Sequence, residues 1–196
     1  MSDGVEAPRE RVLRAAERQF RRFGYRRTTV DDITREAGVA KGSFYLHFAS
    51  KEDAYLAVVE ESLARFLARA EAALRRQDSV PRRMRTLVRV TAEHYGGDDL
   101  LRASMFGDGG LAEGDPARRA AAIQRARLRA LLAEVIAAGQ AEGTVRAELD
   151  PQATAAVLFE VGWAIVLREL DGTSDVPFET ALGVLNDLVG LGLLTR

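Results

Sequence analysis

Apolar residues recur at helical spacing along most of the 196-residue chain, and no segment alternates convincingly between apolar and polar positions as a strand would. Glycine and proline interrupt this pattern and divide it into segments. We therefore predict an all-α protein of about nine helices. The expected helices cover residues 9–23, 30–37, 41–47, 50–77, 81–95, 98–106, 116–142, 151–170 and 177–194.

The first predicted helix carries an apolar stripe that should be buried against the helices that follow it. The stripe consists of Val12, Ala15, Ala16, Phe20 and Phe23. Gly24 comes directly after it and is expected to end the helix, because glycine adopts the left-handed conformation found at many helix ends.

The stretch from Thr28 to Lys51 predicts two short helices joined by a tight turn. Thr29 is a suitable N-cap, and Asp32 follows three residues later as the partner of a capping box. Gly38 is expected to end the first of these helices.

The second short helix has two kinds of face. Phe44 and Phe48 stand four residues apart and can share one buried side. The remaining side chains are a cation, a hydroxyl, a phenol and an imidazole, all able to contact phosphates or base edges. They are Lys41, Ser43, Tyr45 and His47. A helix, a glycine-containing turn and a second helix with a polar outer face indicate a helix-turn-helix.

In this stretch the chain resembles the N-terminal domain of the TetR family of bacterial transcriptional repressors (TetR/AcrR-like). The matching runs are Thr29-Val30-x-x-Ile33, Ala37-Gly38-Val39, Lys41-Gly42-Ser43-Phe44-Tyr45-x-His47-Phe48 and Ser50-Lys51-Glu52. The resemblance implies a three-helix DNA-binding domain over residues 1–50. It also implies a helical ligand-binding and dimerisation domain over residues 51–196, with the helix from about 50 to 77 linking the two.

Two kinds of DNA contact are expected from this domain. Contacts in the groove are assigned to Lys41, Gly42, Ser43 and Tyr45, where Gly42 lets the backbone come close to the DNA. Contacts to phosphates are assigned to Thr29, His47 and Lys51. Residues 1–50 carry ten basic and seven acidic side chains, so this segment is net positive in a chain whose formal net charge is −1. That distribution favours DNA as the partner.

The two last predicted helices are unusually apolar. Residues 151–170 are apolar nearly all round, so more than one of their faces must be covered. The resemblance implies a homodimer joined through these two helices, whose recognition helices lie about 34–36 Å apart on a near-palindromic operator. The alternative is that both helices belong to the core of a monomer.

The resemblance also implies a pocket for a small-molecule effector in the second domain, whose binding is carried to the DNA-binding domain by the helix over 50–77. Candidate lining residues are Phe66, Tyr95, Arg102, Met105, Phe106, Phe159 and Trp163. His94 and Glu160 are further polar candidates. These residues are equally suited to an ordinary core or a dimer interface. Their apolar character favours a largely apolar effector, such as an acyl chain.

Composition excludes several classes of function. The chain has no cysteine and two histidines, His47 and His94, so it offers no nucleophile–base pair for an enzyme, no thiolate metal site and no disulfide. We expect neither a cofactor nor a metal. The polar N-terminus and the absence of long apolar runs predict a cytoplasmic protein without membrane contact. The remaining alternative to a ligand-responsive repressor is a helical protein-interaction module with no specific DNA target, which would leave the residues from 41 to 51 unexplained.

Overall fold

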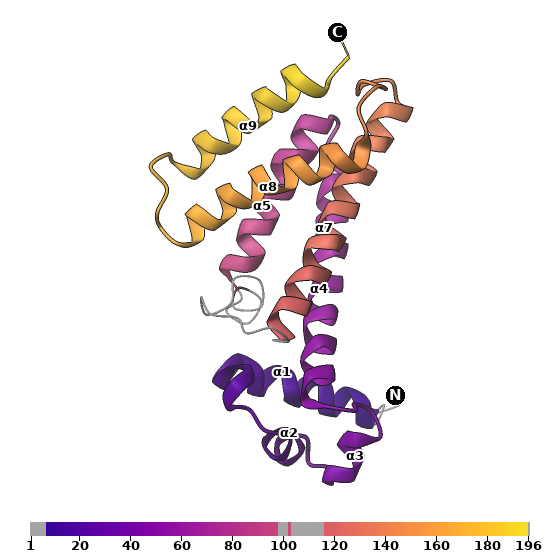
Figure 1. Cartoon of the computed structure of the whole chain (residues 1–196), viewed down its shortest axis with the longest axis vertical. Coiled ribbons are helices and arrows are strands. Elements are labelled where there is room, and N and C mark those ends of the chain that lie inside the picture. The colour runs from indigo at the N-terminus through magenta and orange to yellow at the C-terminus, as the bar shows by residue number, and fades with distance from the viewer. Residues whose placement is uncertain (1–6, 98–101, 103–115, 196) are drawn as a thin grey trace, which may run out of the picture. The chain divides into compact units, whose positions relative to one another are not determined.

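The computed structural model describes residues 7–97, 102 and 116–195. Across these ranges the regular structure is eight α-helices, together with one isolated β-bridge between Val145 and Leu194 (Figure 1). The all-α prediction is therefore confirmed. The helices are α1 (Pro8–Arg27), α2 (Val30–Ala37), α3 (Lys41–Tyr45), α4 (Lys51–Leu74), α5 (Val80–Gly96), α7 (Pro116–Ala141), α8 (Pro151–Leu170) and α9 (Phe178–Leu193). The helix predicted over 98–106 lies outside the described residues, except for Arg102.

The chain divides into two compact units. The first unit is Met1–Ala64 with Asp99–Ile123, and the second is Arg65–Asp98 with Gln124–Arg196. Two helices, α4 and α7, contribute residues to both units. The predicted boundary at residue 50 separates a DNA-binding domain from a ligand-binding domain. It is a division by function, not by compactness, and it stays a prediction. None of the described helices is both long and apolar enough to cross a membrane.

In the first unit, α1 packs on α2 and α3. Four of the five predicted stripe residues of α1 are buried, namely Val12, Ala15, Ala16 and Phe20, and Leu13 joins them. Gly24 breaks the helix as expected, but with φ 75° and ψ 165° it is not in the left-handed helical conformation, and α1 continues beyond the kink to Arg27.

Burial of the last stripe residue, Phe23, was predicted wrongly. Its side chain is 42% exposed, borders an open cleft and is covered by the guanidinium of Arg22, 4.9 Å from the ring centroid. Helical spacing gives the direction in which Phe23 points. It does not tell how far along α1 the neighbouring elements extend, and they do not reach the residue just before the break at Gly24.

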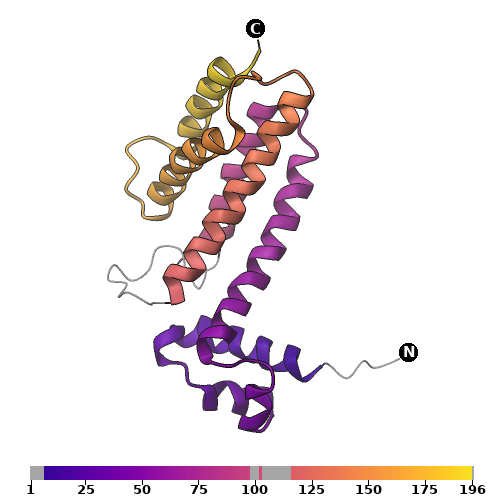
Figure 2. The same ribbon diagram turned by 45° about the vertical axis from the view of Figure 1, so that its right-hand side comes forward.

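In the second unit, α5 packs against both α8 and α9, and α8 and α9 lie side by side (Figure 2). The predicted N-cap of α8 is confirmed, since an Asp150 carboxylate oxygen accepts a hydrogen bond from the Ala153 amide at 2.6 Å. At the start of α9, Glu179 accepts hydrogen bonds from Arg85 at 2.7 Å and from Arg89 at 2.8 Å. These bonds join α9 to the exposed side of α5.

Gly139 in α7 is the most closely packed of the described glycines and yields a stability test. A Cβ at this position would lie 2.6 Å from Val145 Cγ2 and 2.8 Å from Val80 Cγ2. We expect Gly139→Ala to lower the free energy of unfolding by about 1–3 kcal/mol, because the core must shift to admit the methyl group. Urea unfolding measures this change.

Gly42→Ala is the matched control. Gly42 also lies in a helix, but a methyl group at this position would have no neighbouring atom within 4 Å. Its substitution should leave stability unchanged or raise it slightly, because alanine favours helix more than glycine does. Equal stabilities of the wild type and Gly139→Ala would show that the packing around position 139 is looser than described.

Candidate DNA interface and effector cavity

The start of α2 is fixed by a complete capping box. The Thr29 hydroxyl accepts a hydrogen bond from the Asp32 amide at 3.1 Å, and the Asp32 carboxylate accepts one from the Thr29 amide at 3.0 Å. The Thr29 hydroxyl also donates to the carboxylate, and these bonds from Thr29 hold the pKa of Asp32 below its usual value. Gly38 ends α2 with φ 65°. Thr29 is exposed, so a phosphate can reach the amide end of the helix.

The α3 helix is anchored by two aromatic side chains. Phe44 and Phe48 are buried with ring centroids 5.7 Å apart, as predicted. The opposite face is open: Lys41, Gly42 and His47 are exposed, and the Tyr45 side chain is 52% exposed. Ser43 is half-buried. The predicted groove residues thus gather on one five-residue helix.

Lys41 is paired on the protein surface. Its ammonium lies 2.8 Å from an Asp31 carboxylate oxygen in the first turn of α2, and this contact raises the pKa of Lys41. Both side chains are more than half exposed, so the pair is weak in water. A DNA phosphate would compete with Asp31 for the same ammonium.

Lys51 was assigned to a phosphate contact, which implies an exposed ammonium, but its ammonium is bonded within the protein. Its ammonium donates hydrogen bonds to the backbone carbonyls of Tyr25 at 2.8 Å and Thr28 at 2.9 Å, and it lies 4.2 Å from the Tyr25 ring centroid. Partial burial lowers its pKa. Lys51 therefore closes the end of α1, and only its third N–H is left for a phosphate.

One exposed residue of this region was missed from the sequence. Leu46 directly follows α3 and is 81% exposed. Leu46 falls between Phe44 and Phe48, so its spacing places it opposite the buried side. An apolar residue on that predicted exposed side was the signal in the sequence that could have identified it. Its methyl groups can contact the methyl group of a thymine.

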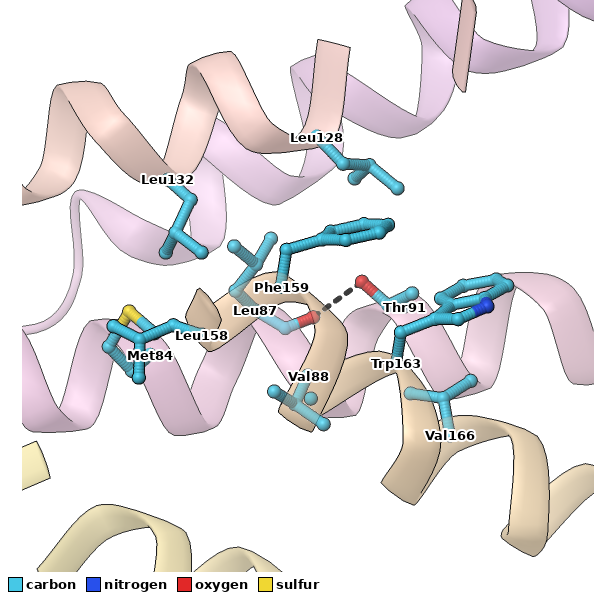
Figure 3. A pocket seen from close by; sticks show the side chains of 11 residues that line it. Met84, Leu87, Val88, Thr91, Leu128, Leu132, Leu158, Phe159, Trp163 and Val166 are labelled. Atoms are coloured by element: carbon cyan, nitrogen blue, oxygen red, sulfur yellow. Dashed lines mark hydrogen bonds between the residues drawn. The ribbon is translucent and has the colours of Figure 1, made fainter. Parts of the chain in front are cut away.

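The second unit contains a cavity of about 30 Å³ between α5, α7 and α8 (Figure 3). Its walls are apolar apart from Thr91, whose hydroxyl donates a hydrogen bond to the Leu87 carbonyl at 2.7 Å. The lining residues are Met84, Leu87, Val88, Thr91, Leu128, Leu132, Leu158, Phe159, Gly162, Trp163 and Val166.

The predicted effector residues are divided by the structure. Phe159 and Trp163 line the cavity, with their rings stacked at 5.9 Å. Tyr95 is buried beside Trp163, with its ring edge-on at 5.2 Å. Phe66 is buried as well, but it stacks on His94 at 4.5 Å and does not line the cavity. Glu160 forms an ion pair with Arg129.

The structure decides one of the three other candidates. Arg102 is half-buried in the first unit, whereas every lining residue belongs to the second. Met105 and Phe106 lie outside the described residues. The aliphatic lining residues were missed because leucine and valine at helical spacing look the same in a solid core as at a cavity wall. In the part of the chain that the structure describes, no three His, Asp or Glu side chains gather as metal ligands would.

Comparison with known proteins places the N-terminal segment in one family. The family model of bacterial regulatory proteins, tetR family, matches residues 12–58. The uncharacterized HTH-type transcriptional regulator YdgC of Bacillus subtilis is 29% identical over 203 residues, covering 100% of this chain and 96% of YdgC. The fatty acid metabolism regulator protein of Bacillus subtilis is 29% identical over 84 residues, covering 43% of this chain and 42% of that protein. The chain spans less than half the length of the first curated relatives it matches.

A solved structure extends the likeness of the fold to nearly the whole chain. The transcriptional regulator FadR from Bacillus subtilis, solved in complex with stearoyl-CoA, superposes with a TM-score of 0.70. It covers 93% of this chain and 98% of that chain at 18% sequence identity. The helices of the second unit therefore follow an arrangement already seen in a transcriptional regulator.

The environment of Lys51 predicts a structural role that can be separated from DNA contact. We expect Lys51→Met to lower the free energy of unfolding by about 1 kcal/mol, because the carbonyls of Tyr25 and Thr28 lose their donor. Chemical denaturation followed by circular dichroism measures this. Lys41→Met, which breaks only an exposed ion pair, is the control and should not change stability measurably. A stable Lys51→Met protein would instead leave phosphate binding as the main role of this lysine.

Proposed function

The chain belongs to the TetR family of bacterial regulatory proteins, and we propose that it is a ligand-responsive transcriptional repressor acting in the cytoplasm. The observation that carries the proposal is the α2–turn–α3 arrangement inside residues 12–58, with α3 anchored by Phe44 and Phe48 and a polar face exposed. A protein-interaction module without a DNA target has no need of this arrangement of cation, phenol and imidazole beside a glycine.

The proposed DNA-binding domain is residues 1–50. We assign groove contacts to Lys41, Gly42, Ser43 and Tyr45, on the exposed part of α3. The open space around Gly42 supports a close approach of the backbone to DNA. Phosphate contacts are assigned to Thr29, at the positive end of α2, to His47 and to the remaining N–H of Lys51.

A homodimer through α8 and α9 is proposed from the apolar surface of these helices. Five large apolar side chains on them are exposed: Val157, Val161, Val184, Leu188 and Leu191. A surface of this kind favours burial against a second copy of the chain, because monomeric proteins rarely expose so many apolar side chains together. Two copies would present two α3 helices about one turn of DNA apart, roughly 34–36 Å, to a near-palindromic operator.

The proposed effector site is the cavity of the second unit. At about 30 Å³ the cavity has room for little more than a water molecule, so an effector has to push its walls apart. Leu128 and Leu132 in its wall belong to α7, a helix that also contributes residues to the first unit. Binding would favour a conformation with displaced helices and reduced DNA affinity, which is a shift of population between two states.

The DNA-binding proposal is tested with the double variant Tyr45→Phe, His47→Ala. Both side chains are exposed, so the variant should fold with unchanged stability, yet lose its preference for the operator, because a base-edge contact and a phosphate contact are removed. Fluorescence anisotropy with duplexes tiling the DNA upstream of the gene measures affinity at two salt concentrations.

The salt dependence of binding and a variant outside the interface are the controls for this test. The wild type should bind one near-palindromic tile tightly and lose affinity as salt rises, because phosphate contacts release counterions. Arg75→Gln removes an exposed cation of the second unit and should bind like the wild type. A folded double variant with wild-type affinity for that tile would refute our placement of the DNA interface.

The dimer proposal is tested with Leu188→Glu. Leu188 is 61% exposed, so the substitution should leave the folded protomer intact while placing a charge in the proposed interface. We expect sedimentation analysis to show a protein of half the wild-type mass with weakened operator binding. Leu46→Glu puts the same charge on an exposed leucine of the first unit and should keep the wild-type mass. A wild-type dimer in Leu188→Glu would exclude this face of α9 as the interface.

A further inference from the structure

We propose that the effector is a neutral, elongated lipophile carrying one hydrogen-bonding oxygen, and that Tyr95 and Gln124 recognise this oxygen at one end of the cavity. The inference rests on the proposed function, in which a small molecule occupies the cavity, and adds the chemical class of that molecule. It follows from a buried polar pair that adjoins an otherwise apolar space.

The pair occupies the layer next to the cavity on two of its three helices, α5 and α7. Tyr95 stands one turn after Thr91 on α5, and Gln124 stands one turn before Leu128 on α7. Both Thr91 and Leu128 line the cavity. Trp163 on α8 joins the two layers, since it lines the cavity and meets the Tyr95 ring edge-on at 5.2 Å. In Figure 3 the Trp163 indole lies beside Thr91, at the opposite end from Met84 and Leu132.

The polar pair is costly to bury. Gln124 and Tyr95 are both 0% exposed, and the Tyr95 hydroxyl donates a 2.7 Å hydrogen bond to the Gln124 side-chain oxygen. Methionine and phenylalanine would fill the same volumes without removing an amide and a hydroxyl from water. The pair does offer both donors and an acceptor, since an amide has two N–H bonds and a phenol can donate and accept. A ligand carbonyl or hydroxyl can exchange into this hydrogen-bonded group.

The charges around the cavity favour a neutral ligand. None of the lining residues is ionisable. Arg129 lies over the Phe159 ring, with its guanidinium 5.2 Å from the ring centroid, but it is paired with Glu160, and the two side chains are 43% and 62% exposed. Arg69 is exposed and bonded to His94 Nδ1 at 2.9 Å. A carboxylate held by Tyr95 and Gln124 would thus be buried without a cation, which costs several kcal/mol.

The apolar part of the ligand would follow α5. From Tyr95 to Met84 this helix rises about 16 Å, and the intervening walls are formed by Leu87, Val88 and residues of the facing helices. This length suits an extended hydrocarbon chain better than a compact ring system. The volume of the cavity is small, so its walls must separate to admit a ligand. An alkyl chain would separate them along their whole length.

Trp163 allows the proposal to be tested directly, because it is the single tryptophan of the chain and lines the cavity. The full-length protein is titrated with four probes of one chain length: decane, decan-1-ol, decan-2-one and decanoate. Tryptophan emission and thermal stabilisation are the two readouts. We expect the alcohol and the ketone to bind about tenfold more tightly than decane, because only they can exchange into the Tyr95–Gln124 group without leaving a buried polar atom unpaired, and decanoate to bind more weakly than either.

Variants assign this preference to the polar pair. Tyr95→Phe and Gln124→Met should each bind decane like the wild type and lose most of the preference for the oxygenated probes. Tyr95→Phe removes a single atom, so it provides the test even where Gln124→Met folds poorly. Thr91→Val is the matched control: it removes the other hydroxyl at the cavity, one that is bonded to the Leu87 carbonyl, and should keep the preference.

Each other outcome is decisive. Equal binding of decane and the oxygenated probes, or a preference that survives Tyr95→Phe, would overturn the inference while leaving the cavity as the effector site. Tightest binding of decanoate, lost in Arg129→Met, would identify an anionic ligand held by Arg129 instead. Absence of any response to all four probes would overturn the inference, because an elongated lipophile would then not enter the cavity.

Discussion

The five residues of α3 are too few to form a stable helix on their own, because nucleation costs more free energy than one turn of hydrogen bonds returns. Burial of Phe44 and Phe48 supplies what the helix lacks, and the Arg9 guanidinium, 5.3 Å from the Phe48 ring centroid, covers this anchor from α1. The exposed side chains of Lys41, Tyr45 and His47 are not part of this anchor. They are therefore available for the DNA contacts that we propose.

In the second unit, by contrast, the residues of the candidate effector site are buried or half-buried. Its helices meet through apolar contacts that leave a small gap, and the buried polar pair Tyr95 and Gln124 stands at the edge of that gap. Glu179 with Arg85 and Arg89 fastens α9 to the outer side of α5. The face of α5 toward α9 is therefore held by ion pairs, whereas its face toward the cavity is held by dispersion contacts and by the Tyr95–Gln124 hydrogen bond to α7. A molecule entering the cavity would therefore displace mainly dispersion contacts and exchange with this hydrogen bond.

The sequence predicted features that depend on neighbours in the chain. The capping box of Thr29 and Asp32, the break at Gly24 and the cap at Asp150 all follow from residues within one turn of each other. Features that depend on distant segments escaped prediction. The carbonyls bonded by Lys51 lie 26 and 23 residues earlier, and the cavity is assembled from three helices, so its aliphatic walls have no local signature. The exposed Phe23 shows that helical spacing identifies the buried face of α1 but not how much of that face the neighbouring helices cover.

Gly162 explains why the gap between the helices is so small. A Cβ at this position would lie 3.1 Å from Val88 Cγ2, so α8 approaches α5 about as closely as a glycine allows. A ligand larger than the cavity would have to move side chains or helices, because α5 and α8 are already in contact at this point. Of the three helices that form the walls, α7 is the one that also supplies residues to the first unit. A displacement of α7 would therefore also move residues of the first unit.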